Sequence, residues 1–322
     1  MSVAEASGEA FEMQLTRSAL NSRLDQWAVR LREVAGVWET IDEMNRELTN
    51  WRFEAPGEMW REIVRDCREH PIAGLIHDDL FTSWSFRKPR GYPGDATLLD
   101  FIYQHDDARP LLQAVSARGQ AIYAYARQVA ACSGVRHRRD RLAARIDEIC
   151  NTRDRARILS VACGHLREAG LSDAIATGRL ETLIALDQDQ ESLRTLADAH
   201  RGRKVDPRHV SVRQLLSGKF TESNFDLIYA AGLYDYLEDR VAERLTRVLF
   251  EKLRPGGKLL IANFLDTVPD AGYMETFMDW FLILRSPAQF RRVLKEIARE
   301  GVSAAEFSDD AIIYLEVTRR LP

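Results

Sequence analysis

A loop of small residues and a carboxylate further along the chain carry the first chemical signal in this sequence. Ala162-Cys163-Gly164 follow a run of β-type residues, and such small side chains let the backbone approach a ligand closely. Asp187 ends the next β-type run. A carboxylate placed there accepts hydrogen bonds from both hydroxyls of a ribose. An acid at a strand end is as often a cap or a surface residue, so the pair predicts a nucleoside site only together with its surroundings.

Further candidates surround this pair. Main-chain groups near residues 211–213, after a third β-type run, are placed to face an adenine edge, and a fourth run leads into a second stretch of small residues. We therefore expect a cofactor site that also includes the residues implied by the resemblances described below. Its predicted members are Tyr92, Ala162, Cys163, Gly164, Glu168, Asp187, Gln188, Val212, Arg213, Ala230 and Gly232.

The elements that must position these residues alternate between strand and helix. Short β-like runs cover residues 157–161, 182–186, 209–212, 225–229 and 258–262, with helical stretches at 190–200 and 239–253. Pro255-Gly256-Gly257 is expected to end the second of these helices. Such alternation indicates a parallel sheet covered by helices. Two final runs, 303–307 and 311–318, are joined so tightly that they must be antiparallel.

The predicted fold class is therefore α/β, with parallel strands and a terminal antiparallel hairpin, and ligands of such sheets bind at the carboxyl ends of the strands. From about residue 155 to 322 the sequence resembles class I S-adenosylmethionine-dependent methyltransferases, most recognisably in Leu253-Arg254-Pro255-Gly256-Gly257-Lys258. The resemblance implies a Rossmann-like methyltransferase sheet and S-adenosyl-L-methionine as cofactor.

The sequence departs from that class at the first turn. Ser160 stands where the class has an acid, and Leu166 replaces a later glycine. Contacts to the methionine part of the cofactor must then come partly from elsewhere, and Glu168 and the N-terminal helices are the candidates. The motif G-x-G-x-x-G is absent, which argues against a dinucleotide.

The first half of the chain has a different texture. Within the stretch from Phe11 to Trp51, apolar residues recur at helical spacing, and Leu15 is the first of them. The same spacing returns over residues 109–150. We expect an all-helical region over 1–150 that covers the substrate, and a methyltransferase core over 151–322. The apolar stripe of residues 15–48 suits a homodimer contact or packing on the same chain. The basic run of residues 136–141 is predicted to be a solvated helix face.

A narrower resemblance rests on Arg90-Gly91-Tyr92-Pro93-Gly94-Asp95 and on residues 272–285. Together with the first turn, these segments are similar to a bacterial family named for enzymes that make 3-hydroxypalmitic acid methyl ester, a quorum signal, over about residues 80–322. The resemblance implies that the loop folds over the cofactor, with Tyr92 beside it and Asp95 holding a polar group. Asp95 is equally well placed to cap the following helix.

The same segments contain the candidates for substrate binding, which are Arg90, Tyr103, Tyr273, Trp280 and Arg285. A guanidinium pairs with a carboxylate in a bidentate fork, which is the role considered for Arg285 beside the alternative of a surface charge. The aromatic stripe of residues 273–281 fits core packing or a substrate pocket.

Methyl transfer from a sulfonium is an in-line displacement that requires alignment and exclusion of water. A carboxylate acceptor needs no general base, whereas a phenol, amine or guanidine does, and Asp95, Tyr234 and Asp235 are the candidates. The first hypothesis is O-methylation of a small carboxylate such as a hydroxy fatty acid. The alternatives are an N-methyltransferase for an amino acid, amine or guanidino metabolite, and a non-catalytic cofactor-binding or scaffold protein. No histidine spacing marks a metal site.

Composition and charge limit the class of protein and its partners. The 322 residues are 45% apolar and 29% charged, as in ordinary globular proteins. A net charge of -4 creates no general attraction to nucleic acid. There is no apolar run long enough to span a membrane, and the N-terminus lacks the features of a secretory signal. Four scattered cysteines suit reduced thiols. We expect a cytoplasmic protein with a small-molecule acceptor and no nucleic-acid partner.

Overall fold

The computed structural model describes residues 17–297 and 303–321, so the part of the predicted first helix that contains Leu15 lies outside the described residues. The chain forms two compact units. Of the described residues, the helical unit comprises 17–133 and 269–281, and the sheet unit comprises 134–268, 282–297 and 303–321. The chain therefore passes from one unit to the other three times: within a long helix, before residue 269 and after residue 281.

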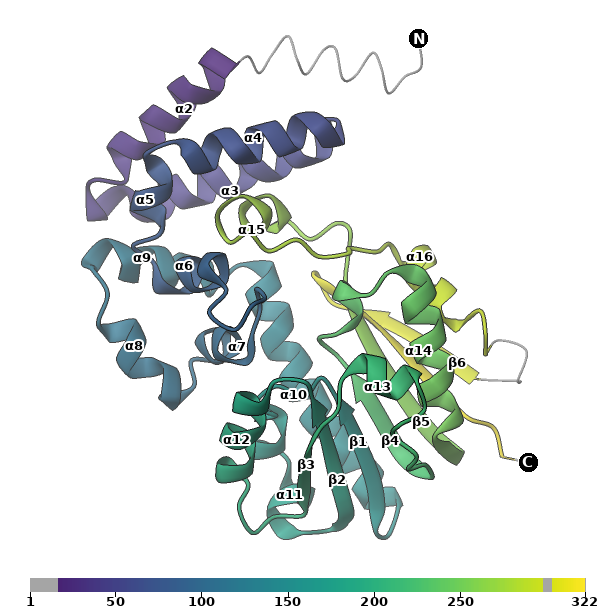
Figure 1. Cartoon of the computed structure of the whole chain (residues 1–322). Coiled ribbons are helices and arrows are strands. Elements are labelled where there is room, and N and C mark those ends of the chain that lie inside the picture. The colour runs from purple at the N-terminus through teal and green to yellow at the C-terminus, as the bar shows by residue number, and fades with distance from the viewer. Residues whose placement is uncertain (1–16, 298–302, 322) are drawn as a thin grey trace, which may run out of the picture. The chain divides into compact units, whose positions relative to one another are not determined.

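A seven-stranded sheet forms the centre of the sheet unit, in the order β3-β2-β1-β4-β5-β7-β6 (Figure 1). Strands β1 to β5 pair in parallel, and β7 runs antiparallel to both β5 and β6. This order confirms the predicted fold class, terminal hairpin included. The strands are β1 Ala156–Val161, β2 Leu180–Asp187, β3 Val205–His209, β4 Phe225–Ala230, β5 Leu253–Phe264, β6 Ser303–Ser308 and β7 Ile312–Thr318.

The central strands are apolar because helices bury both of their faces. Every residue of β4 is buried. On one face, side chains such as Ile228 pack with Leu245 and Leu249 of α14. The helices of this unit are α10 Ala130–Thr152, which begins in the helical unit, η3 Arg167–Gly170, α11 Asp173–Thr177, α12 Gln190–Ala199, α13 Val212–Leu216, η4 Tyr234–Tyr236, α14 Asp239–Glu251, α16 Pro287–Arg291 and η5 Arg292–Leu294.

Two predicted boundaries in this unit are wrong. Strand β3 ends at His209, and the predicted strand residues 210–212 instead lead into α13, because Ser211 and Gln214 form a capping box. Helix α14 already ends at Glu251, so Pro255-Gly256-Gly257 does not end it and lies within β5. A glycine is needed at 257, since a Cβ there would lie 2.6 Å from the carbonyl oxygen of Phe225.

The helical unit is built from helices of the N-terminal part of the chain together with one inserted segment, residues 269–281. Its helices are α2 Arg17–Arg30, η1 Val34–Gly36, α3 Val37–Glu54, α4 Gly57–Glu69, α5 Ile72–Ile76, α6 Leu80–Arg87, α7 Ala96–Tyr103, η2 Asp106–Ala108, α8 Arg109–Gln113, α9 Ala117–Ala126 and α15 Ala271–Phe277. Helix α15 comes from the far end of the sequence and is buried along its whole length. It ends at Phe277, so the helical spacing read over residues 272–285 continues as a helix for only part of that segment.

Buried polar contacts hold α15 in this unit. The Glu275 carboxylate accepts hydrogen bonds from Arg52 Nε at 2.7 Å and from Trp60 Nε1 at 2.6 Å. Arg68 donates to the carbonyl oxygens of Glu275 and Thr276, at the end of the helix. A buried carboxylate is stable only when its oxygens are bonded in this way, so these partners specify where α15 docks.

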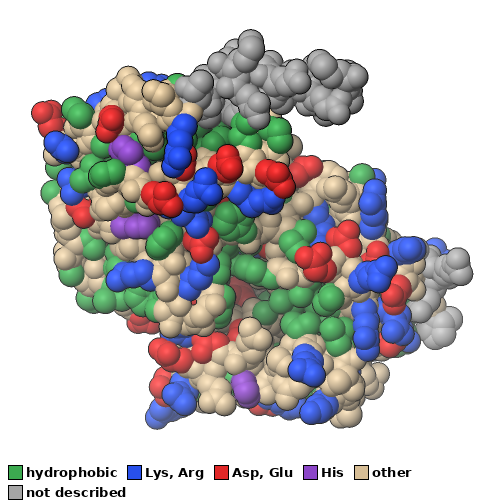
Figure 2. Space-filling model, turned by 45° about the horizontal axis from the view of Figure 1, so that its top comes forward, with side chains coloured by type: hydrophobic (Ala, Val, Ile, Leu, Met, Phe, Trp, Pro, Cys, Tyr) green, Lys and Arg blue, Asp and Glu red, His purple; other side chains and the backbone are tan. Residues whose placement is uncertain are grey.

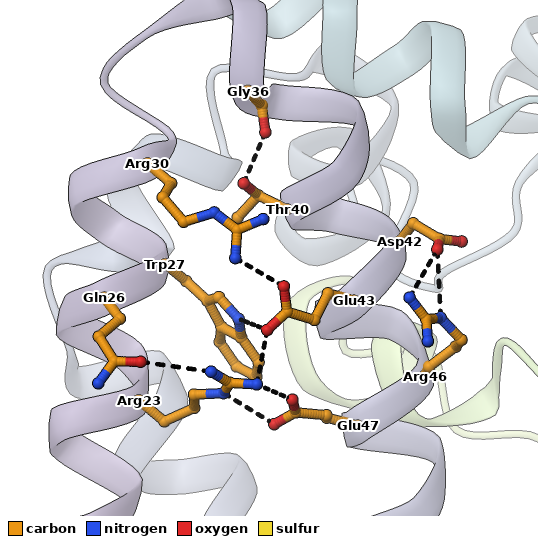
Figure 3. Close-up of polar contacts among 10 residues, drawn as sticks. All are labelled: Arg23, Gln26, Trp27, Arg30, Gly36, Thr40, Asp42, Glu43, Arg46 and Glu47. Carbon is orange, nitrogen blue, oxygen red and sulfur yellow. Dashed lines mark hydrogen bonds and ion pairs between the residues drawn. The ribbon is translucent and has the colours of Figure 1, made fainter.

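A second set of polar contacts joins α2 to α3 (Figure 3). Arg30 Nη1 lies 2.6 Å from Glu43 Oε2, and Arg23 forms an ion pair with Glu47. The hydrogen bond from Arg30 is the main cause that lowers the pKa of Glu43. These side chains are partly exposed, so each pair contributes only a few tenths of a kcal/mol to ~1 kcal/mol. The buried Trp27 lies beside them, and its ring centroid is 5.8 Å from that of Trp51 in α3.

Charged groups of both signs are interspersed over the face shown in Figure 2, which agrees with the small net charge. In residues 17–297 and 303–321, no helix has the length and apolar character needed to cross a membrane. Cytoplasmic location and a homodimer stay predictions.

Candidate functional site

The loop after β1 rises from the sheet in a left-handed conformation. Ala162, Gly164 and Leu166 have φ values of 55°, 53° and 51°. Such a conformation costs about 1–2 kcal/mol for a residue with a side chain, so the surroundings must hold it. The Cys163 amide donates to the Leu186 carbonyl at 3.0 Å and thereby ties the loop to the end of β2. Ala162 is exposed, which leaves this backbone accessible at the rim of the sheet.

Asp187 lies beside this loop at the end of β2. Its Oδ2 accepts a hydrogen bond from the Gly164 amide at 2.8 Å, and its Oδ1 accepts one from the Asp189 amide at 2.9 Å. The side chain is 7% exposed, and burial raises the pKa of its carboxyl against the effect of those amides. The Gln188 amide also bonds to this carboxylate, and the three amides leave at least one of its four lone pairs for another donor. Gly164 and Asp187 thus meet at one rim of the sheet.

Glu168 occupies a position next to β1 and β4. It is buried, and its Oε1 accepts a hydrogen bond from the Tyr229 hydroxyl at 2.8 Å. Burial raises the pKa of Glu168, while the charge of Arg138 acts against that rise. Ser160, at the end of β1, is also buried and hydrogen-bonds to Tyr229. The chain therefore brings a carboxylate close to the end of β1.

The end of β4 forms the next part of the rim. Ala230 is buried inside the sheet, and Gly232 is partly exposed beyond it. Arg138 Nη1, from α10, donates to the Ala231 carbonyl at 2.7 Å. A Cβ at position 232 would lie 3.4 Å from Nη2 of the same arginine. Arg138 is not among the predicted site residues, although its spacing from Val135 and Leu142 places it on the buried face of α10.

Three further predicted cofactor residues of the sheet unit are Gln188, Val212 and Arg213. Gln188 is exposed, and its carbonyl oxygen lies 3.0 Å from the ring nitrogen of His209. Val212 is the first residue of α13 and packs against the apolar core, whereas Arg213 points to solvent. Their contact with a cofactor stays a prediction.

Of the candidate bases in the sheet unit, Asp235 is close to the strand ends and Tyr234 is directed into the core. Tyr234 is fully buried, its hydroxyl lies 2.9 Å from that of Thr246, and burial raises its pKa. Asp235 Oδ1 accepts a hydrogen bond from the Phe264 amide at 2.6 Å. Burial raises the pKa of Asp235 to about 6, so the group is largely ionised at neutral pH. These properties suit a proton acceptor at Asp235 and not at Tyr234.

The Arg285 guanidinium forms its hydrogen bonds within the protein. It is 2% exposed, and its five N–H groups are all used. Nε and Nη2 donate to Asp239, and Nη2 also donates to the Leu237 carbonyl. Nη1 donates to the Tyr234 carbonyl at 2.9 Å and to Asn263 Oδ1 at 2.7 Å. These contacts support a structural role, in which Arg285 fixes the loop after β4.

The other predicted site residues lie in the helical unit. Asp95 is buried, caps α7 through the Leu98 amide and accepts a hydrogen bond from Trp84 Nε1 at 2.9 Å. The capping prediction for Asp95 is thus confirmed. Tyr273 is buried with its hydroxyl 3.0 Å from that of Thr82. Arg90, Tyr92 and Tyr103 are partly buried and Trp280 is buried. The roles proposed for these residues in cofactor or substrate binding stay predictions.

One group among the described residues has the geometry to hold a metal ion. The ligand atoms of Asp100, His105 and Asp107 all lie within 4.8 Å of one another. The group belongs to the helical unit, and Asp107 is exposed. His105 Nδ1 also accepts a hydrogen bond from the Asp107 amide, as the N-cap of η2.

The sequence matches no protein-family model and no curated protein. Solved structures match it. A possible exported protein from Bordetella parapertussis is 16% identical, with a TM-score of 0.55 over 95% of this chain and 100% of that chain. This likeness extends over both units and concerns the fold alone.

Two further matches cover a smaller share of this chain. Magnesium protoporphyrin IX methyltransferase from Synechocystis, with bound SAH, is 12% identical, with a TM-score of 0.45 over 59% of this chain and 85% of that chain. The N-methyltransferase NodS from Bradyrhizobium japonicum, also in complex with SAH, is 15% identical, with a TM-score of 0.41 over 57% of this chain and 87% of that chain.

Proposed function

We propose that this protein is an S-adenosylmethionine-dependent methyltransferase that acts on a small molecule. The observation that carries the proposal is the meeting of Asp187 with the Gly164 amide at the rim where the parallel strands end. The sheet supports the same assignment. Its antiparallel strand β7 lies between β5 and β6, and this is the parallel sheet with a terminal hairpin that the sequence resemblance implies.

The residues at this rim fit an adenosyl group with an amino-acid end. The Asp187 oxygens are prearranged by three amides and retain at least one lone pair for a ribose hydroxyl. The exposed loop at Ala162 offers backbone without bulky side chains. Glu168 lies on the β1–β4 side and provides negative charge for an ammonium group. When bound, the cofactor supplies a methyl group already activated by the positive sulfur.

Two acceptor classes follow from this site. O-methylation of a carboxylate, such as that of a hydroxy fatty acid, is the first candidate and is supported by the narrower sequence resemblance. The second is methylation of an amine, guanidine or hydroxyl, which Asp235 favours because a buried carboxylate that ionises near pH 6 is suited to accept a proton. Arg285 adds no support to the carboxylate class, since its donors are engaged within the protein.

Calorimetric titration with S-adenosylhomocysteine (SAH) tests the proposal. We expect the wild-type protein to bind it, and Asp187→Ala to lower the affinity by about 1.5–3 kcal/mol, the scale of hydrogen bonds to a charged group. Asp198→Ala removes an exposed carboxylate from α12 and is the matched control. Absence of binding to the folded wild-type protein would favour a scaffold, and unchanged affinity in a folded Asp187→Ala would remove this residue from the site.

A further inference from the structure

Arg138 is a buried cation in a segment that the sequence predicts to be solvated. Its neighbour His137 is exposed, whereas Arg138 itself is 6% exposed. The prediction of a solvated face is therefore wrong for this residue. Helical spacing explains the difference, because Val135 and Leu142 lie one turn before and after Arg138 on the same buried face of α10. Burying a guanidinium is costly unless its donors find partners.

Most donors of Arg138 have no partner in the chain as described. Among residues 17–297 and 303–321, its one hydrogen bond runs from Nη1 to the Ala231 carbonyl. A guanidinium has five N–H groups, so the others remain for a ligand. Gly232 follows directly, and its lack of a side chain keeps the space beside Nη2 open. The free donors thus lie against the end of β4, at the rim that also contains Asp187.

Two buried carboxylates share this environment. The charge of Arg138 lowers the pKa of both Glu168 and Asp235, in each case against the larger effect of burial. Neither forms a direct ion pair with Arg138 in the part of the chain that the structure describes. Glu168 is held by Tyr229, and Asp235 by the Phe264 amide. A guanidinium and a carboxylate that lie near each other without pairing match the two charges of an α-amino acid.

We propose that Arg138 binds the carboxylate of the amino-acid end of the cofactor, while Glu168 receives its ammonium group. This inference rests on the proposed function and assigns the methionine end to the β1–β4 side of the rim, with the adenosine end at Asp187. It also explains the departures from the class at the first turn, because α10 and Glu168 supply what Ser160 and Leu166 do not. Arg138 forms a bidentate fork that a lysine cannot reproduce.

The test compares SAH with 5′-methylthioadenosine, which lacks the amino-acid end. We expect Arg138→Met to weaken SAH about tenfold to a hundredfold, the range for hydrogen bonds to a charged group, and to change 5′-methylthioadenosine less than about threefold. Arg138→Lys keeps the positive charge but cannot form two parallel hydrogen bonds, so its affinity for SAH should lie between those of the wild type and Arg138→Met. Arg141→Met removes an exposed arginine on the same helix, and its affinities for both ligands should match those of the wild type.

Each other result is decisive. Equal losses for the two ligands would show that Arg138 only supports the Ala231 loop, and unchanged SAH binding would remove Arg138 from the cofactor site. If SAH binding is unchanged and KM for an anionic acceptor rises, the carboxylate belongs to the acceptor and the assignment is overturned. Wild-type protein that binds neither ligand would instead refute the proposed function.

A measurement on the wild-type protein covers the case in which Arg138→Met does not fold. The methyl ester of SAH carries no carboxylate charge, so we expect it to bind about tenfold or more weakly than SAH itself. Equal affinity for the ester and the acid would overturn the proposal without any substitution.

Discussion

At the scale of single residues, hydrogen-bond partners decide which buried side chains remain available for chemistry. Arg285 and Asp187 are both charged and both nearly buried. All five donors of Arg285 are used by the protein, whereas the amides bonded to Asp187 leave at least one of its four lone pairs. Residue type alone does not separate these outcomes, because they depend on which backbone groups lie within hydrogen-bond distance.

Asp235 provides a test at the same scale. Its pKa is raised to about 6, so the carboxylate is ionised above that pH and becomes protonated below it. For an amine or hydroxyl acceptor, we expect the rate to fall about tenfold per pH unit below pH 6, and Asp235→Asn to lower kcat at pH 8 by roughly 10²–10⁴. The amide still accepts the hydrogen bond from Phe264, so the loop should keep its conformation.

A carboxylate acceptor gives a different profile. It is ionised without help, so Asp235→Asn should change kcat little, and no fall near pH 6 should appear. Steady-state rates with a panel of carboxylate and amine acceptors measure this difference. Loss of activity in Asp235→Asn with every acceptor, at unchanged pH dependence, would contradict the role of Asp235 as a base.

At the scale of elements, close backbone contact sets the position of α15. A Cβ at Gly272 would lie 2.4 Å from the carbonyl carbon of Leu48 and 2.5 Å from its carbonyl oxygen. Both atoms belong to the backbone of α3, which cannot move aside as a flexible side chain can. Helix α15 thus docks where a residue without a side chain allows it, and no periodicity in the sequence reveals that contact.

We therefore expect Gly272→Ala to lower the free energy of unfolding by about 1–3 kcal/mol or more, because α15 must move away from α3. Gly74→Ala is the matched control. It lies in α5 with no atom within 4 Å of the added Cβ, so it should be neutral or stabilise the protein by up to about 1 kcal/mol. Urea unfolding measures both, and equal effects would show that the backbone contact is absent in solution.

At the scale of the whole molecule, the helical unit is not a simple N-terminal addition. Residues 269–281 return to it from between β5 and β6, and α15 there buries Tyr273, Met274 and Phe277. Inside the sheet unit, Leu265 pairs with Arg285, so the two ends of this insertion leave from neighbouring positions. The predicted division into residues 1–150 and 151–322 as cap and core stays a prediction in functional terms.

Replacement of residues 269–281 by a short Gly/Ser linker tests this organisation. Each of the three large buried side chains stabilises the unit by about 1.5–3 kcal/mol, and their joint loss is comparable to the stability of a domain. We expect hydrogen exchange to lose protection in residues 17–130, while β1 to β5 keep theirs. The same linker inserted at exposed Gly202 is the control. Retained protection of residues 17–130 would contradict a structural role for α15.

The sequence by itself determined the α/β sheet, the terminal hairpin and the place of Gly164 and Asp187 at one rim. These features follow from local periodicity and from the rule that parallel strands end at the same edge. Only the tertiary structure decided that Arg138 is buried, that Arg285 is fully bonded and that α15 joins the N-terminal helices. Such outcomes depend on contacts between residues far apart in the chain, and those contacts leave no regular spacing in the sequence.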